Sequence, residues 1–443
     1  MNHVFYREWK KTPPLIDRAE GVYLYDREGK RYLDGSGGPA VINIGHGVGE
    51  VIDAMMAQAR KVCFPYVGHF SSDAQIELSR KVVAFAPPGM ARVYFVSGGS
   101  EATEIAMKMA RQYHLVRGDS SRVKIIGRWQ GYHGATIGAL SVSGHTSRRN
   151  DYQPYLLNFP HIAPAYCYRC PYEKSYPGCG IACALELDKT IKAEGPSHIA
   201  AFIAEPFVGN SLGAVPAPPE YFPLVREICD RHGVLFIADE VITGFGRTGK
   251  NFGIDHWGVS PDLIITGKGT GSGYTPLAAV IVHRKLCETF ESSPKAGFFM
   301  GYTYSGNPLS CAAGLAVLTY IEKHGLVQRS ARMGEYLFAK LARVAEMPIV
   351  GDIRGKGLLA GIEFVQERKS KAPFPQSKKV AEALTDVAFR NGLILMSGTG
   401  TADGISGDHT VISPPFTITE NQIDELVGLL EKSIKETCAQ IGV

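Results

Sequence analysis

The segment PDLIITGKG, residues 261–269, contains the residue on which the interpretation of the whole chain depends. Its apolar and β-branched residues 263–266 follow a proline and end at a glycine, a pattern typical of a short strand buried on both faces. Lys268 stands directly after this predicted strand. Burial lowers the pKa of a lysine, and the neutral amine is the form that attacks carbonyl carbons. Lys268 is therefore a candidate nucleophile; the alternative is an ordinary lysine on an exposed loop.

A second buried strand is predicted over residues 234–238 and ends at Asp239 and Glu240. One lysine and one carboxylate at the ends of buried strands are what a pyridoxal-phosphate site requires. The lysine holds the cofactor aldehyde as a Schiff base, and the acid keeps the ring nitrogen protonated. The sequence therefore predicts Lys268 and Asp239 as the catalytic pair.

Strand and helix patterns alternate from about residue 60 onward. The predicted strands of this region cover residues 93–96, 123–126, 199–204, 234–238, 263–266 and 278–282. Helical patterns separate most of them, which indicates an α/β fold with a mostly parallel sheet flanked by helices. Polar or glycine-rich residues follow four of these strands, at 97–100, 205, 239 and 268. Because such sheets bind ligands at the carboxyl ends of their strands, we expect these groups to meet at one edge.

The two ends of the chain predict a second, smaller domain. Residues 21–34 alternate apolar and polar side chains around a Glu-Gly turn, which favours an antiparallel hairpin. Residues 358–364 are typical of a strand, and Thr419 opens a capping box ahead of a final amphipathic helix. We predict a large domain over residues 61–324 and a small α+β domain built from residues 1–60 and 325–443.

A candidate anion site lies between the strand at 93–96 and a helical pattern at 101–111. The intervening Ser97-Gly98-Gly99-Ser100 turn would leave free N–H groups at the start of a helix, where the helix dipole attracts an anion such as a phosphate. The alternative is a tight turn with a serine N-cap. Tyr132 follows another predicted strand and is placed to stack on a flat ring, or else to pack on the sheet.

Composition narrows the class of protein. The chain has 443 residues, of which 45% are hydrophobic and 20% charged, as is usual for a globular protein. Its formal net charge of +4 is small, and no run of basic residues is dense enough to indicate binding of nucleic acid. No segment has the apolar length of a membrane span, and the N-terminus lacks the apolar core of a signal peptide. We therefore expect a cytoplasmic protein that binds neither nucleic acid nor membrane.

Four of the nine cysteines, Cys167, Cys170, Cys179 and Cys183, form a CxxC followed by a CxxxC. This spacing resembles a zinc or iron–sulfur ligand set, and it is equally compatible with reduced structural thiols or with a disulfide. None of the three alternatives makes the cysteine cluster catalytic.

Seven motifs, in order along essentially the whole chain, resemble those of the class III aminotransferases, which are pyridoxal-phosphate enzymes of fold type I. They lie at residues 97–102, 132–134, 204–206, 237–241, 244–249, 261–269 and 302–308. The resemblance implies that Lys268 forms the Schiff base and then shuttles a proton, and that Asp239 pairs with the ring nitrogen. It also implies that Glu205 orients groups near the cofactor without reacting.

The same resemblance assigns residues that hold the cofactor. Tyr132 would stack on one face of the ring, Val241 would pack on the other, and Gly99 and Ser100 would hold the phosphate. Thr303 resembles the threonine that this family sends across a dimer interface to the partner's phosphate. The expected assembly is a homodimer or a tetramer.

Departures from the family pattern bear on the substrates. Ile242 stands where enzymes for 4-aminobutyrate or ornithine carry a glutamine, and Asn210 replaces the glutamate that gates an arginine in those enzymes. The chain is therefore most similar to the ω-amino acid or amine:pyruvate branch. Many members of that branch have a mobile arginine near the C-terminal Pro-Pro segment, whereas residues 401–409 contain none.

The function implied is pyridoxal-phosphate-dependent transamination from an amine or ω-amino acid to a 2-oxo acid such as pyruvate. A racemase, aminomutase or decarboxylase on the same fold is the first alternative, because these enzymes share the same cofactor chemistry. A non-catalytic cofactor-binding or scaffold protein is the second, and only the cysteine cluster favours it.

Overall fold

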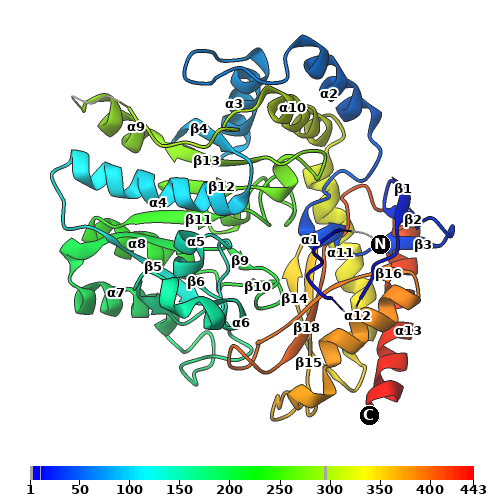
Figure 1. The fold of residues 1–443 in the computed structure, drawn as a ribbon. Helices are drawn as coiled ribbons and strands as arrows, with labels where there is room; N and C mark the ends of the chain where they lie inside the picture. The colour runs from blue at the N-terminus through cyan, green and yellow to red at the C-terminus, as the bar shows by residue number, and fades with distance from the viewer. Residues whose placement is uncertain (1–2, 10, 294–296) are drawn as a thin grey trace.

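A mostly parallel sheet forms the centre of the protein, whose computed structural model describes residues 3–9, 11–293 and 297–443 (Figure 1). In spatial order its strands are β4 (Met90–Val96), β13 (Ala278–His283), β12 (Leu263–Thr266), β11 (Leu235–Asp239), β8 (Ile199–Ala204), β5 (Lys124–Trp129) and β6 (Ser143–Gly144), with β7 (His161–Ile162) also paired to β5. Each strand predicted for this region is present, and the predicted α/β class is confirmed.

Strand β13 departs from the parallel pattern, because it runs antiparallel to both of its neighbours, β12 and β4. The connection from β12 to β13 contains only the short 3-10 turn η4 (Lys268–Thr270). A parallel return requires a crossover of a dozen or more residues, usually with a helix, so this short connection produces an antiparallel pair.

Every residue of β8, β11 and β12 is buried, because helices cover both faces of the sheet. Side chains alternate between the faces along each strand. In β8, Ala201 and Ile203 join the cluster formed with α4 (Gly99–Val116), whereas Phe202 and Ala204 join the cluster formed with α8 (Tyr221–His232). This two-sided burial explains why the sequence of these strands is continuously apolar.

Elements from the two chain ends share a sheet on the other side of the molecule (Figure 1). Strands β1 (Ile16–Glu20), β2 (Tyr23–Asp26) and β3 (Arg31–Asp34) are antiparallel, and β16 (Leu393–Ile394) adds to β3. The predicted hairpin is thus present, extended by β1. A second sheet has the order β14 (Val350–Lys356), β15 (Leu359–Phe364), β18 (Asp408–Ile412) and β17 (Met396–Thr399). The domain boundaries near residues 60 and 325 stay a prediction.

Helices complete the architecture. The C-terminal part contains α11 (Leu326–Ala345), α12 (Val380–Arg390) and α13 (Glu420–Ile441), and the predicted capping box at Thr419 begins α13. The remaining helices and short strands are α1 (Gly37–Ala40), α2 (Gly49–Lys61), α3 (Asp73–Phe85), α5 (Ile137–Val142), α6 (Thr146–Arg149), α7 (Ala182–Glu194), α9 (Arg284–Glu291), α10 (Pro308–Lys323), β9 (Phe207–Val208) and β10 (Val215–Pro216). Within the described ranges, no helix is both long enough and apolar enough to cross a membrane.

One buried cation, Arg247, ties the chain ends to the central sheet region. Its guanidinium donates to the carbonyl oxygens of Leu358 (3.0 Å) and Pro414 (2.6 Å) and to the side-chain oxygen of Asn43 (2.7 Å). Burial lowers the pKa of Arg247 to about 9. The hydrogen bonds to three distant segments offset part of the cost of burying this charge, and they fix the small sheets beside the carboxyl edge of the large one.

Candidate active site

A cavity of about 310 Å³ opens at the carboxyl edge of the central sheet. All but one of the predicted site residues line it, namely Gly99, Ser100, Tyr132, Glu205, Asp239, Val241 and Lys268. The exception is Thr303, which is exposed and lies outside the lining. The structure therefore brings together residues from five strand ends, those of β4, β5, β8, β11 and β12, as expected for a sheet of this kind.

Lys268 and Asp239 are close because their strands, β12 and β11, are parallel neighbours. Burial lowers the pKa of Lys268 to about 8, although the charge of Asp239 acts in the opposite direction. Lys268 also has a φ of 42°, a left-handed conformation that a non-glycine residue adopts at some cost in energy. A strained backbone and an amine that is partly neutral near pH 7 are properties of a nucleophile in a functional site.

Two hydrogen-bond donors of the protein itself hold the carboxylate of Asp239. Its side chain is 4% exposed; one oxygen accepts a 2.7 Å hydrogen bond from Nδ1 of His133, and the other accepts from the N–H of Val241 at 3.0 Å. Burial lowers the pKa of His133, but the carboxylates of Glu205 and Asp239 outweigh it and raise the pKa above its ordinary value. The imidazole thus fixes the position of the Asp239 carboxylate.

The sequence alone predicts no role for His133. The histidine was visible in the motif at residues 132–134, but its partner is far away in the sequence, so only the folded chain reveals the contact. The available signal was a histidine directly after Tyr132, the tyrosine predicted to stack on the cofactor ring.

Glu205 contacts the backbone of Tyr132 at the same edge of the sheet. One of its oxygens accepts from the backbone N–H of Tyr132 (2.9 Å), and the other faces Nη2 of buried Arg128 at 3.1 Å. Burial raises the pKa of Glu205, whereas His133 and Arg128 lower it and prevail. These contacts place Glu205 as a residue that positions its neighbours. Glu240, by contrast, accepts from the N–H groups of Gly253 and Ile254 and takes no part in the cavity.

The turn before α4 has the properties of an anion site. Its N-cap residue is Gly98, which makes no side-chain cap, so the first N–H groups of this 18-residue helix lie free of a serine cap. Ser100 instead accepts from the N–H of Ala135 at 3.0 Å. A Cβ on Gly99 would lie 3.2 Å from Val241, which shows how closely the turn approaches the cavity wall. N–H groups without a side-chain cap, together with the helix dipole, favour a phosphate here.

Pyridoxal phosphate fits these groups. The cavity offers an anion site at Gly99 and Ser100, a flat aromatic side chain in Tyr132, an apolar one in Val241, a carboxylate in Asp239 and an amine in Lys268. When bound, such a cofactor supplies a carbonyl carbon and an electron-withdrawing ring.

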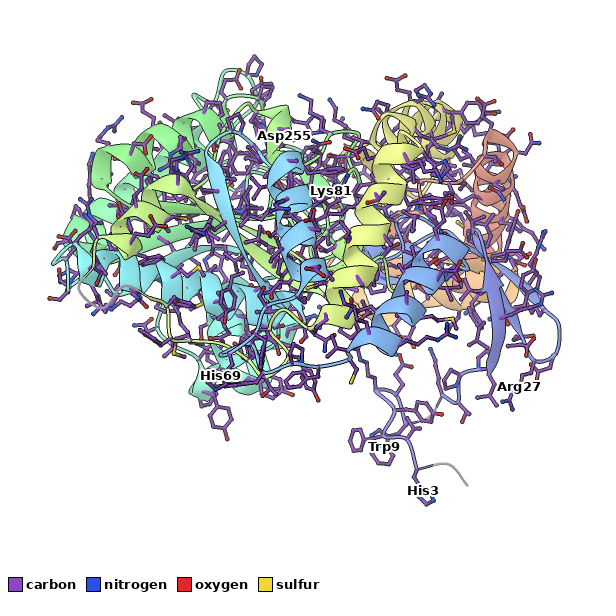
Figure 2. All side chains as sticks on the ribbon, turned by 90° about the horizontal axis from the view of Figure 1, so that it is seen from above. His3, Trp9, Arg27, His69, Lys81 and Asp255 are labelled. Carbon is purple, nitrogen blue, oxygen red and sulfur yellow. The ribbon has the colours of Figure 1, made fainter. Side chains whose placement is uncertain are left out.

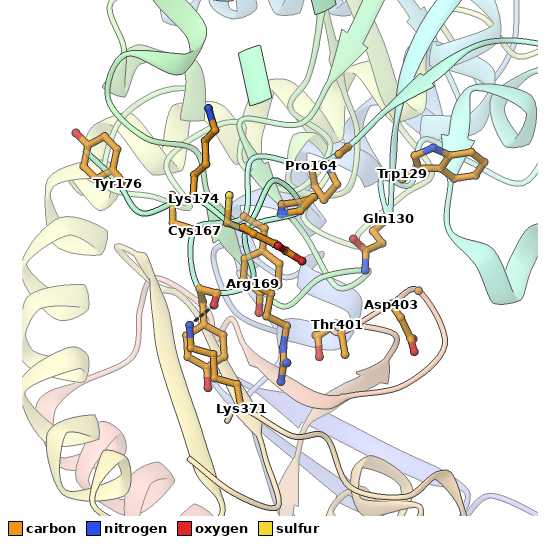
Figure 3. A pocket seen from close by; sticks show the side chains of 18 of the residues that line it. Trp129, Gln130, Pro164, Cys167, Arg169, Lys174, Tyr176, Lys371, Thr401 and Asp403 are labelled. Carbon is orange, nitrogen blue, oxygen red and sulfur yellow. Dashed lines mark hydrogen bonds between the residues drawn. The ribbon is translucent and has the colours of Figure 1, made fainter. Parts of the chain in front are cut away.

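The cysteine cluster lies away from this cavity. Its four members, Cys167, Cys170, Cys179 and Cys183, line a small void of about 20 Å³, and all nine cysteines are free thiols in the structure. Over the described part of the chain, no group of three or more histidine, cysteine or acidic side chains is placed to hold a metal. A larger open hollow of about 1080 Å³ borders Cys167 and Cys170 (Figure 3), but neither Lys268 nor Asp239 lines it.

The family model for aminotransferase class-III matches residues 5–434. The chain belongs to the class III aminotransferases. It is 40% identical over 429 residues to the uncharacterised aminotransferase YodT of Bacillus subtilis, covering 96% of each chain. It is 36% identical over 437 residues to a putrescine–pyruvate aminotransferase of Pseudomonas aeruginosa, covering 98% of this chain and 92% of that one.

Solved structures agree with this class III assignment. The crystal structure of an (S)-enantioselective omega-transaminase from Thermomicrobium roseum superimposes with a TM-score of 0.90 at 37% identity, covering 97% of this chain and 93% of that one. Class III aminotransferases depend on pyridoxal phosphate, so the predicted cofactor, enzyme class and fold type are confirmed. The protein catalyses pyridoxal-phosphate-dependent transamination between an amine donor and a 2-oxo acid, and a racemase, aminomutase or decarboxylase is not favoured.

Proposed function

We propose that this aminotransferase takes nitrogen from an amine or ω-amino acid and passes it to pyruvate or a similar 2-oxo acid. The observation that carries the proposal is the single cavity containing Lys268, Asp239 and the anion site. Lys268 is the group that bonds to the cofactor carbonyl and then moves a proton. Asp239, held by His133, stabilises positive charge on the ring nitrogen. Glu205 keeps Tyr132 in place, and Tyr132 and Val241 bound the ring.

The walls of the cavity support an amine donor of this kind. Beyond the groups that fit the cofactor, the lining includes the apolar side chains of Phe207, Ile242 and Met396. Asn210, also in the lining, is neutral. An apolar wall favours the hydrocarbon part of an ω-amine. The name of the relative putrescine–pyruvate aminotransferase indicates that this relative accepts such a donor.

A half-reaction screen tests the donor class. The holoenzyme is mixed with each donor in the absence of any acceptor, and the pyridoxamine absorbance band is followed. We expect putrescine and β-alanine to produce the band faster than 4-aminobutyrate or ornithine at equal concentration, because Ile242 and Asn210 replace the polar groups that serve those two substrates. Conversion of 4-aminobutyrate or ornithine alone would contradict the proposed branch.

We also propose a homodimer in which Thr303 completes the partner's phosphate site. Thr303 is exposed and follows Phe299, which is 86% exposed, while Tyr304 beside it is 62% exposed. The ring of Tyr304 contacts that of Phe64 at 5.8 Å between centroids, next to further exposed aromatic residues at 66 and 70. Such a patch of large apolar side chains is typical of a protein interface. In Figure 2 the segment with His69 and the one with Trp9 project from the same edge of the molecule.

A mixed dimer tests this arrangement. One subunit carries Lys268→Ala and the other Thr303→Ala. If Thr303 serves the partner, both changes fall in the same site and leave the other intact, so activity per dimer recovers to about half that of the unchanged enzyme. The measurement is kcat of the purified heterodimer.

The matched control carries both changes in one subunit, opposite an unchanged partner. Each site then contains one change, so this dimer should be nearly inactive, provided that Thr303→Ala alone is severe. Equal activity of the two arrangements, or an active monomer on a sizing column, would contradict the shared site.

The cytoplasm is the compartment we propose, because its reducing conditions keep free thiols such as these nine reduced.

A further inference from the structure

We propose that Arg148, on the short helix α6, binds the carboxylate of the 2-oxo acid acceptor. This inference rests on the proposed function and names the group that recognises one of its two substrates. It answers a question that the sequence raises, because the loop between β17 and β18 contains no arginine, so the acceptor carboxylate needs another cation.

Arg148 is placed at the mouth of the cavity and is available for a ligand. It lies in the cavity lining, and its guanidinium carbon is 4.8 Å from the centroid of the Tyr132 ring. Among the described residues, no hydrogen bond or ion pair engages that guanidinium. The adjacent Arg149 differs completely, since it is buried and donates to the carbonyl oxygens of Leu140, Ser141 and Ser143. Arg149 therefore stabilises the fold, whereas the donors of Arg148 remain for a bound anion.

The two carboxylates of the cavity already have partners. Glu205 faces Arg128, and Asp239 accepts from His133. Arg148 is a positive group without such a partner. Its charge also lowers the pKa of the Lys268 amine, although burial and the charge of Arg247 lower that pKa more. A carboxylate bound at Arg148 would balance this charge within the cavity that Lys268 also lines, and the carbonyl of a 2-oxo acid has to reach that lysine.

The loop between β17 and β18, residues 400–407, packs directly against α6. The side-chain amide of Gln130 donates to the carbonyl oxygen of Gly400 at 2.7 Å. At Gly404 a Cβ would lie 2.5 Å from Oγ1 of Thr146, the first residue of α6. Figure 3 shows Thr401 and Asp403 of this loop near Gln130. The loop thus occupies the space beside α6 without supplying a cation, and the cation comes from the helix that it covers.

The test compares two acceptors that differ in the carboxylate. Nitrogen transfer is measured from one amine donor to pyruvate and to butanal, in the unchanged holoenzyme and in Arg148→Gln. We expect the ratio of kcat/KM for pyruvate to that for butanal to fall about 10-fold or more, as loss of a charge-assisted hydrogen bond implies. Arg148→Lys should recover part of the ratio. The inhibition constant of propionate, an unreactive carboxylate, should rise in Arg148→Gln.

Two matched variants separate this role from others. Arg117→Gln removes an arginine that also lies over a tyrosine ring, 5.4 Å from the centroid of Tyr113, but far from the cavity, and it should leave the ratio unchanged. Arg7→Gln removes the rival arginine in the cavity lining. An unchanged ratio in Arg148→Gln, an equal loss for both acceptors, or a fall in the ratio only in Arg7→Gln would overturn the assignment. An unchanged enzyme that used neither acceptor would overturn the proposed function with it.

Discussion

Lys268→Ala is expected to lower kcat of transamination by roughly 10³-fold or more, because the change removes both the nucleophile and the proton-transfer group. The Lys268 side chain lies in the cavity beside Asp239, and burial has already lowered its pKa to about 8. Alanine fits the same backbone with little change in packing, so the midpoint of thermal unfolding of the apoprotein should stay close to that of the unchanged chain. Single-turnover absorbance with a good donor measures the loss.

Lys250 provides the control for this experiment. Its amine is exposed and donates to the carbonyl oxygen of Asp255, outside the cavity. Lys250→Ala should therefore retain normal turnover. If Lys250→Ala were inactive while Lys268→Ala still turned over, the assignment of the catalytic lysine would be wrong.

Asp239→Asn is expected to reduce kcat by about 10²-fold or more, with a smaller loss in cofactor affinity. Asparagine has the shape of aspartate but no negative charge, so the ring nitrogen of the cofactor loses the partner that stabilises its proton. The hydrogen bond from His133 to Asp239 is also weakened, since it now ends on a neutral amide. Turnover and the dissociation constant of the cofactor are measured on the same preparation.

Glu240→Gln is the matched control, because Glu240 is the neighbouring buried carboxylate but accepts from Gly253 and Ile254 outside the cavity. We expect this variant to lose stability rather than catalytic rate. Near-normal kcat in Asp239→Asn, or an equal loss of kcat in both variants, would refute a specific role for the Asp239 charge.

The sequence predicted the central sheet and the edge where its chemistry lies, because strands buried on both faces are recognisable as short apolar runs. It did not predict the direction of β13, which depends on the length of the connection after Lys268. Strand β14 and the short strands β16 and β17 were also missed. Residues 350–356 and 396–399 contain glycine and polar side chains, and their pairing is decided by distant partners.

In the candidate site, too, some residues are recognisable from the neighbouring sequence, whereas others depend on contacts between distant segments. That Lys268, Asp239 and Glu205 meet in one cavity was predictable, because each stands at the end of a buried strand; their roles stay a prediction. His133 was not predictable, since its contact with Asp239 joins two different strand ends, and neither was Arg148, whose position depends on how α6 packs. Thr303 stays a prediction because a single chain cannot contain a site that two chains share.

The antiparallel placement of β13 has a consequence for how the enzyme is made. The edge strand β4 leads into the glycine turn before α4 and is synthesised early, yet its partner in the sheet is β13, which leaves the ribosome after Lys268. A nascent chain that ends before residue 278 holds the lysine, the aspartate and the glycine turn, but it lacks the strand that joins β4 to the others. Pairing between such distant segments is slow. We therefore expect the sheet edge that carries the candidate cofactor site to form late in biosynthesis, after residue 283 has been added to the chain.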